Sequence, residues 1–195
     1  MNKILLRPAL FVLAGALLPS FAYAHVGVGD THGFLHGLMH PLSGIDHLCA
    51  MVAVGLWAAQ MGGRSVWLVP LTFVSVMALG GGLAMAGIDL SFAEHGIALS
   101  VLMLGVLIAA SIRLPLWLSC SMVGLFALFH GHAHGSEMPE SVSGLAYALG
   151  FMLSTALLHI AGIMFGLRMQ RLAQEWIVEL TGAGIAVCGG YLAVY

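Results

Sequence analysis

Long apolar runs with almost no charge dominate this chain of 195 residues. Only 7% of its residues are charged and the mean hydropathy is +1.03, whereas soluble domains carry about 25% charged residues. The length of the runs favours membrane-spanning helices over a barrel. The sequence therefore predicts an all-α integral membrane protein and excludes a soluble fold. The net charge of −2 also provides no basic surface for nucleic acid.

The first 24 residues have the pattern of a secretory signal peptide. Two basic residues precede a short apolar stretch over residues 9–18, and Ala22-Tyr23-Ala24 is an A-x-A cleavage signal. Cleavage after residue 24 leaves residues 25–195 as one membrane domain of a bacterial inner-membrane protein, with its N-terminal His25 in the periplasm. An uncleaved first membrane helix is the alternative, although the apolar stretch is short for a span.

Six apolar segments follow and predict a compact bundle of six membrane spans. They lie near residues 41–61, 66–86, 95–112, 114–130, 143–167 and 174–194. With the mature N-terminus outside, the cytoplasmic loops contain all the basic residues that remain, which are Arg64, Arg113, Arg168 and Arg171. The positive-inside rule thus agrees with the signal peptide, and the even number of spans places the C-terminus in the periplasm as well.

Glycine is abundant, with 26 residues, and several glycines lie close together within the predicted spans. The clearest groups are Gly80-Gly81-Gly82, Gly162 with Gly166, and Gly182 with Gly184. Because small residues allow helix backbones to approach in a membrane, these groups predict close helix packing rather than a chemical role.

The first chemical motif runs from His40 to His47 and opens the first predicted span. Pro41 suits the first position of a helix, which would place Asp46 and His47 about 8–9 Å below the helix start. An ionised carboxylate at that depth is costly, and together with a neutral imidazole it suits a divalent first-row metal. An Asp–His hydrogen bond that only holds helices together is the alternative.

The spacing of the two histidines in this motif leaves two arrangements open. His40 and His47 lie about 10 Å apart along a regular helix. They can bind one ion only if the chain before Pro41 folds back; otherwise they serve successive sites.

The second motif runs from Phe129 to Glu137 and closes the fourth predicted span. If the helix continues, His130, His134 and Glu137 fall on one face because they are spaced i, i+4 and i+7, while His132 points elsewhere. A polar helix end with surface histidines is the alternative. The first span enters from the outside and the fourth returns to it, so we expect both motifs to meet at the outer end of the bundle.

The residues after the cleavage signal form a further group of metal-binding side chains. His25 would carry a free α-amine beside its imidazole, and Asp30, His32 and His36 follow in a glycine-rich segment that can fold back. We expect an external metal site built on His25 with some of these residues. A tail without any binding role is the alternative.

Both motifs resemble those of the HupE/UreJ family of nickel or cobalt permeases, which have H-x5-D-H in the first span and F-H-G-x-A-H-G-x-E in the fourth. These patterns are met by His40, Asp46 and His47, and by Phe129, His130, Gly131, Ala133, His134, Gly135 and Glu137. The resemblance covers the whole chain. It implies inward movement of Ni2+, or Co2+, across the inner membrane for hydrogenase or urease maturation, with the ion as transported substrate and no prosthetic group.

Two other functions follow from the same residues. An intramembrane zinc hydrolase could use Glu137 as a general base, although the chain has no HExxH motif. A metal sensor or assembly protein would bind the ion without moving it. The chain also lacks a nucleotide-binding motif, so we expect no direct use of ATP. We expect a permease rather than an enzyme, working in the lipid bilayer as a monomer or a homo-oligomer.

Two polar residues stand apart in the inner half of the chain. His159 lies within the fifth predicted span and Glu179 lies near the start of the sixth. They either form the inner part of an ion pathway or are a buried hydrogen-bonded histidine and a glutamate that reaches the inner interface.

Overall fold

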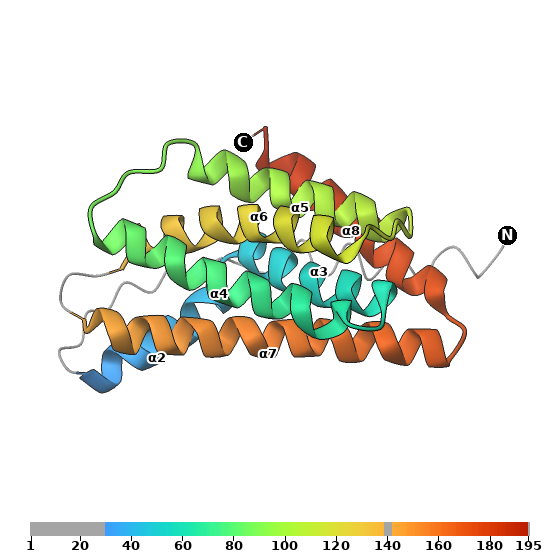
Figure 1. Ribbon diagram of the computed structural model, residues 1–195, viewed down its shortest axis with the longest axis horizontal. Coiled ribbons are helices and arrows are strands. Elements are labelled where there is room, and N and C mark those ends of the chain that lie inside the picture. The colour runs from blue at the N-terminus through green and yellow to red at the C-terminus, as the bar shows by residue number, and fades with distance from the viewer. Residues whose placement is uncertain (1–29, 139–141, 195) are drawn as a thin grey trace, which may run out of the picture.

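The computed structural model describes residues 30–138 and 142–194, with side chains from residue 33, and every regular element in those ranges is a helix (Figure 1). The helices are α2 (Asp30–Ser43), α3 (Ile45–Met61), α4 (Ser65–Met85), α5 (Ala93–Ala109), α6 (Leu116–Ser136), α7 (Gly144–Arg171) and α8 (Glu175–Leu192). The all-α fold is thereby confirmed. The predicted signal peptide lies outside the described residues, as does His25.

Several of these helices are suited to a membrane. Three of them, α4, α6 and α7, are long and apolar enough to cross it, and α2 with α3 is a fourth candidate if the bent pair counts as one span. A helix occupies each of the six segments expected to span, but α5 has only 17 residues, or about 26 Å of helix, against a hydrocarbon core of about 30 Å. The count of six spans therefore stays a prediction.

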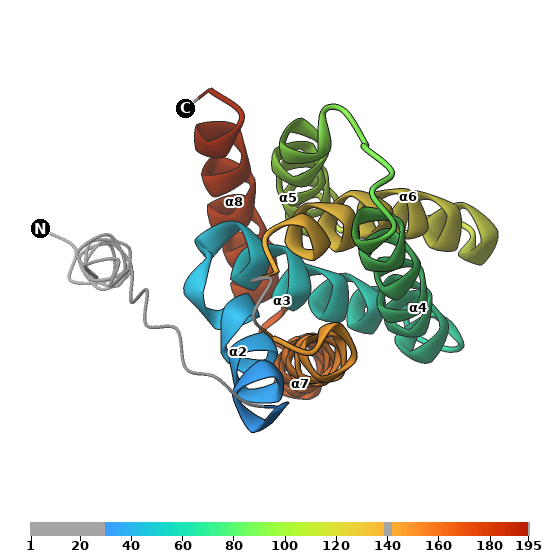
Figure 2. The same cartoon turned by 90° about the vertical axis from the view of Figure 1, so that its left-hand side faces the viewer.

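Helix α3 lies at the centre of the bundle and contacts α2, α4, α5, α7 and α8 (Figure 2). Ten of its 17 residues are buried, and they lie on all sides of the helix rather than along one stripe. Around it, α4 packs on α6, α5 packs on α8 and α2 packs on α7. His47, near the start of α3, is consequently enclosed by neighbouring helices, whereas Ile45 is 57% exposed.

A bend of 83° between α2 and α3 changes the expected start of the first span. Pro41 lies inside the last turn of α2 instead of opening the span, and α3 begins at Ile45 after an extended Gly44. Asp46 and His47 therefore lie in the first turn of α3, not 8–9 Å below a helix start. The part of the glycine-rich segment from Asp30 onward, expected to fold back toward an external metal site, forms helix α2, which Gly37 lets pack directly on the backbone of α7.

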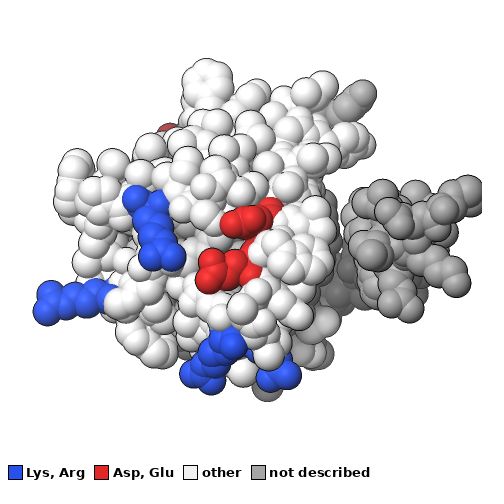
Figure 3. Space-filling model, turned by 90° about the vertical axis from the view of Figure 1, so that its right-hand side faces the viewer, with Lys and Arg blue, Asp and Glu red and all other residues white. Residues whose placement is uncertain are grey.

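The opposite end of the bundle carries the arginines. This is where α3, α5 and α7 end and α4, α6 and α8 begin, and it contains Arg64, Arg113, Arg168 and Arg171. Figure 3 shows basic side chains along the rim of this end and acidic ones nearer its middle. The two histidine motifs lie at the other end, so the structure keeps the charge asymmetry on which the predicted orientation rests.

Close packing of α3 on α7 depends on glycine. A Cβ on Gly55 would overlap the carbonyl oxygen of His159, and a Cβ on Gly162 would overlap the carbonyl oxygen of Val52. Gly162 belongs to the groups expected to mediate packing, whereas Gly184 of another such group faces open space. Backbone contact rather than glycine spacing thus identifies the glycines that matter.

Gly55→Ala should lower the stability of the detergent-solubilised protein by about 1–3 kcal/mol, because α3 and α7 must separate to admit the methyl group. Thermal unfolding followed by size-exclusion chromatography measures the change in Tm. Gly184→Ala is the matched control and should leave Tm unchanged or slightly raised, since alanine favours helix. Equal Tm values for Gly55→Ala and the wild type would contradict this account of the packing.

Candidate metal centre

The two histidine motifs meet at the end of the bundle opposite the arginines. The last turn of α2, the first turn of α3 and the last turns of α6 bring their ligating atoms together. Two groups result, each with one ligand atom per residue and all of these atoms within 4.8 Å of one another. We call His40, His134 and Glu137 the outer group, and His47, His130 and His134 the inner group. His134 belongs to both.

Three ligand atoms converge in the outer group. The Nδ1 atom of His134 lies 2.8 Å from Oε2 of Glu137 and 2.9 Å from Nε2 of His40, and that Nε2 lies 3.1 Å from the same Oε2. A ring nitrogen carries either a proton or a lone pair, so hydrogen bonds satisfy at most two of the three contacts. A cation bound by all three atoms would satisfy every contact. Neighbouring ligands of an octahedral ion with bonds of about 2.1 Å lie about 3 Å apart.

Glu137 provides negative charge at this outer group. Hydrogen bonds from His134, and secondarily from His40, hold the pKa of its carboxyl well below the usual range, so the group is ionised at neutral pH. Its side chain is 49% exposed, compared with 21% for His40. The outer group therefore presents a carboxylate to the surroundings and an imidazole directly behind it.

The inner group is buried. Its three histidines are at most 8% exposed, and the ring centroid of His47 lies 3.7 Å from that of His134 and 4.7 Å from that of His130. Both nitrogens of His47, Nδ1 of His130 and Nε2 of His134 are buried without a hydrogen-bond partner among the described residues. Leaving a buried polar atom unpaired costs about 1–3 kcal/mol. Four such atoms in one place are typical of a binding site rather than of a packed core.

Ser100 determines which nitrogen of His130 is free. The Ser100 hydroxyl donates its single proton to the carbonyl oxygen of Ile97 at 2.7 Å, so it can only accept from Nε2 of His130 at 2.8 Å. His130 therefore carries its proton on Nε2 and a lone pair on Nδ1, the nitrogen without a partner. A hydrogen bond of this kind behind a histidine fixes its tautomer for metal binding.

His134 can serve each group in turn, because it presents a different nitrogen to each and the single lone pair of its neutral ring can reside on either. Its Nδ1 atom lies in the outer group, and its Nε2 atom is the buried nitrogen left for the inner group. His130 and His134 lie at the C-terminal end of α6, where the negative end of the helix dipole favours a cation.

Of the candidate ligands in the two histidine motifs, Asp46 is the one that lies in neither group of the described residues. Its Oδ1 atom accepts a hydrogen bond from the backbone N–H of His47 at 2.8 Å, and the side chain is partly exposed. A carboxylate in the first turn of α3 offsets the positive end of that helix, which would otherwise disfavour a cation at His47. The position supports an electrostatic role, and direct ligation by Asp46 stays a prediction.

The other described histidines of the two motifs and of the expected external site lie outside both ligand groups. α6 continues to Ser136, which confirms the common face of His130, His134 and Glu137, and His132 points away and donates from Nε2 to the carbonyl oxygen of Ile88 at 2.8 Å. His36 is exposed, one turn before His40, with their ring centroids 6.4 Å apart. The side chains of the other residues expected in the external site, His25, Asp30 and His32, lie outside the described residues.

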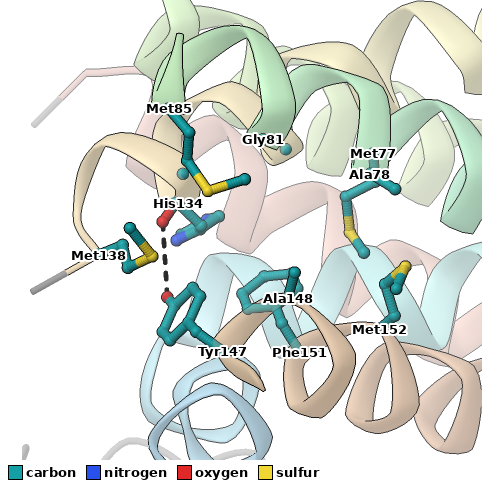
Figure 4. Close-up of a pocket in the computed structure, with 12 residues that line it drawn as sticks. Met77, Ala78, Gly81, Met85, His134, Met138, Tyr147, Ala148, Phe151 and Met152 are labelled. Carbon is teal, nitrogen blue, oxygen red and sulfur yellow. Dashed lines mark hydrogen bonds between the residues drawn. The ribbon is translucent and has the colours of Figure 1, made fainter. Parts of the chain in front are cut away.

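Two aromatic side chains of α7, which no sequence motif marks, lie around the centre. Phe151 stacks on His134, with ring centroids 5.4 Å apart, and lies 5.8 Å from His40 and 5.5 Å from His47. Tyr147, one turn earlier in α7, donates to the carbonyl oxygen of His134 at 3.5 Å (Figure 4). An aromatic pair one turn apart is a common core pattern, so nothing in the sequence distinguishes these two residues.

A small cavity adjoins the centre. It has a volume of about 40 Å³ and lies between α4, α6 and α7, with His134, Tyr147 and Phe151 in its wall. Four methionines complete much of the lining, and they are Met77, Met85, Met138 and Met152 (Figure 4). Flexible thioether side chains can adapt to a change in the position of His134.

His134→Ala should weaken Ni2+ binding at least tenfold, because it removes a ligand from both groups. His132→Ala is the matched control, since it removes a buried histidine from the same turn of α6 but from neither group, and should change the affinity less than threefold. Titration calorimetry on the purified protein measures both dissociation constants. Equal losses in the two variants would show that position on the common face does not decide binding.

Two comparisons with known proteins give matches over most of the chain. The sequence model of the family described as HupE / UreJ protein matches residues 12–192. The chain is also 46% identical over 183 residues to a protein of Rhizobium leguminosarum bv. viciae named Protein HupE, and the match covers 93% of this chain and 95% of that protein. No solved structure matches the chain. Both sequence matches include the two histidine motifs.

Proposed function

Because the chain belongs to the HupE/UreJ family, we propose that it is a permease that moves Ni2+, or Co2+, inward across the bacterial inner membrane. The observation that carries the proposal is a partly exposed ligand group and a buried one that share His134. The proposed role is to supply the ion for hydrogenase or urease maturation. In this orientation the outer group faces the periplasm, as do both termini of the mature chain, and the arginines face the cytoplasm.

Capture begins at Glu137. Its exposed carboxylate attracts a hydrated cation, and His40 and His134 then replace part of the water shell. Two imidazoles and one carboxylate favour first-row transition metals over Mg2+ and Ca2+, which prefer oxygen ligands alone. The ligand set does not discriminate nickel from cobalt.

Transfer to the inner group uses the shared histidine. As the ion leaves Nδ1 of His134, that nitrogen takes up a proton and Nε2 releases one, so the single lone pair of the ring moves to Nε2. The ion then meets that lone pair together with His47 and His130. Their unpaired lone pairs replace the ligands that are lost. This arrangement gives His40 and His47 successive sites, one of the two possibilities left open by their spacing.

A transport role fits these residues better than catalysis does. Glu137, the candidate general base of a hydrolase, is a member of the outer group and bonds to two of its histidines. A sensor or assembly protein would bind the ion at the same residues but would not move it. Uptake of radioactive Ni2+ into proteoliposomes separates a permease from both alternatives.

Glu137→Gln and Asp46→Asn should each reduce that uptake at least tenfold at limiting Ni2+, while the amount of protein in the vesicles stays normal. Both changes keep the side-chain volume and remove a negative charge, one from the outer group and one from the start of α3. Glu175→Gln is the control, because Glu175 is exposed at the opposite end of the bundle. Uptake at the wild-type rate in either test variant would refute its assigned role, and no uptake by the wild type would refute the permease.

We also propose that His25, with His32, His36 and Asp30, forms an external site that passes ions to the outer group. The supporting observation is His36, whose ring lies beside that of His40. Replacing His25 and His32 together, or adding one residue before His25, should remove one bound ion or weaken the affinity of the processed protein. Unchanged metal stoichiometry and affinity in both variants would leave this segment without a binding role.

A further inference from the structure

His159 is a buried histidine that neither ligand group uses. It lies in α7 and is 1% exposed, and in the part of the chain that the structure describes neither of its ring nitrogens has a hydrogen-bond partner. It is therefore not the hydrogen-bonded core histidine that the sequence allowed as an alternative. A neutral imidazole has one N–H and one lone pair, and leaving both unpaired in a packed bundle is costly. The ring is thus available to a ligand.

A continuous file of rings joins His159 to the outer group. In order, the file is His40, His134, His47, His130, Phe73 and His159, and successive ring centroids lie 5.0, 3.7, 4.7, 5.5 and 5.2 Å apart. Four different helices and both histidine motifs contribute to it before it reaches α7. The file of rings begins at the partly exposed end of the bundle and ends in its interior.

The depth of His159 follows from its position in α7. Phe151 contacts the rings of both groups, and His159 lies eight residues further toward the arginine end. At about 1.5 Å per residue this is about 12 Å deeper, close to the middle of the 28-residue helix. His159 therefore lies between the outer end and the predicted cytoplasmic face.

Two further atoms that could act as metal ligands lie beside this position. Phe73 of α4 contacts His159 of α7, and one turn along each helix the Thr155 hydroxyl donates to the Met77 sulfur at 3.8 Å. Thr155 and His159 are four residues apart and share one face of α7. Thr155 is fully buried and Met77 is 2% exposed. An imidazole, a hydroxyl and a thioether thus line the same stretch of the α4–α7 interface.

We propose that His159 is a third binding position for the transported ion, with Thr155 and Met77 as additional donors. The inference rests on the proposed permease function, since it places this position on the path of the same ion. Nitrogen and sulfur ligands suit late first-row transition metals and exclude Mg2+ and Ca2+. The ring of Phe73 lies between His130 and His159, so no shared ligand joins this position to the inner group as His134 joins the first two.

The test separates binding from transport. His159→Phe should leave the affinity for the first Ni2+ within twofold of the wild-type value, because both ligand groups are intact, and should reduce uptake into proteoliposomes at least tenfold. His95→Phe is the control, since His95 is exposed and its ring contacts Phe92 outside the file. It should change neither quantity. Uptake within twofold of the wild type in His159→Phe would overturn the proposal.

Two more variants distinguish a ligand from a residue that only fills space. His159→Gln keeps the size and polarity but is a poor ligand for these ions, whereas His159→Cys is smaller and ligates them well. We expect Cys to restore at least three times the uptake of Gln. Equal or greater uptake with Gln would show that His159 acts through packing. These variants also decide the matter if His159→Phe does not fold.

Metal stoichiometry tests the position even if the wild type transports nothing. At saturating Ni2+, the purified wild type should bind one ion more than His159→Phe, as measured by mass spectrometry of the metal content after gel filtration. Equal stoichiometry would overturn the third position regardless of transport. Absence of uptake by the wild type together with this difference would refute the permease and retain the binding position.

Discussion

A neutral imidazole in an apolar bundle brings one proton and one lone pair, and both need partners. The outer half of this molecule is organised by that requirement. The Ser100 hydroxyl accepts a hydrogen bond from the N–H of His130, and the carbonyl oxygen of Ile88 accepts one from the N–H of His132. In each ring the other nitrogen therefore keeps a buried lone pair. His134 gives one nitrogen to the outer group and keeps the other free. The helices thus bind the N–H groups of His130 and His132, while the unpaired nitrogens of His47, His130 and His134 remain for an ion.

Much of the fold could be predicted because its signals are local. Apolar runs indicate where α3 to α8 lie in the sequence, and the arginines indicate which end of the bundle faces the cytoplasm in the predicted orientation. Helix α2 could not be predicted, because its stability comes from contact rather than from periodicity. Gly37 lets the backbone of α2 contact the backbone of Tyr147 in α7, and the sequence around Gly37 gives no indication of this contact. Pro41 accordingly lies inside the last turn of α2 instead of starting another helix.

The site was predictable to the extent that one helix supplies it. His130, His134 and Glu137 share a face of α6, and their spacing alone predicts this. The tautomer of His130 and the ring stacked on His134 could not be predicted, since Ser100 and Phe151 come from other helices. The relation between His40 and His47 also needed the structure, because the bend between α2 and α3 decides it.

The distribution of charge along the proposed pathway has an energetic consequence. The outer group contains a carboxylate, whereas the inner group and the position at His159 consist of neutral ligands. An ion that moves inward therefore leaves its negative ligand behind and keeps its full double charge. The membrane potential does about 2.3 kcal/mol of work per elementary charge per 100 mV, hence about 4.6 kcal/mol on a divalent ion. Because the interior ligands are neutral, an inside-negative potential acts on the full charge of the ion as it moves inward. The carboxylate attracts the ion strongly only at the outer group, where a dilute ion must be captured.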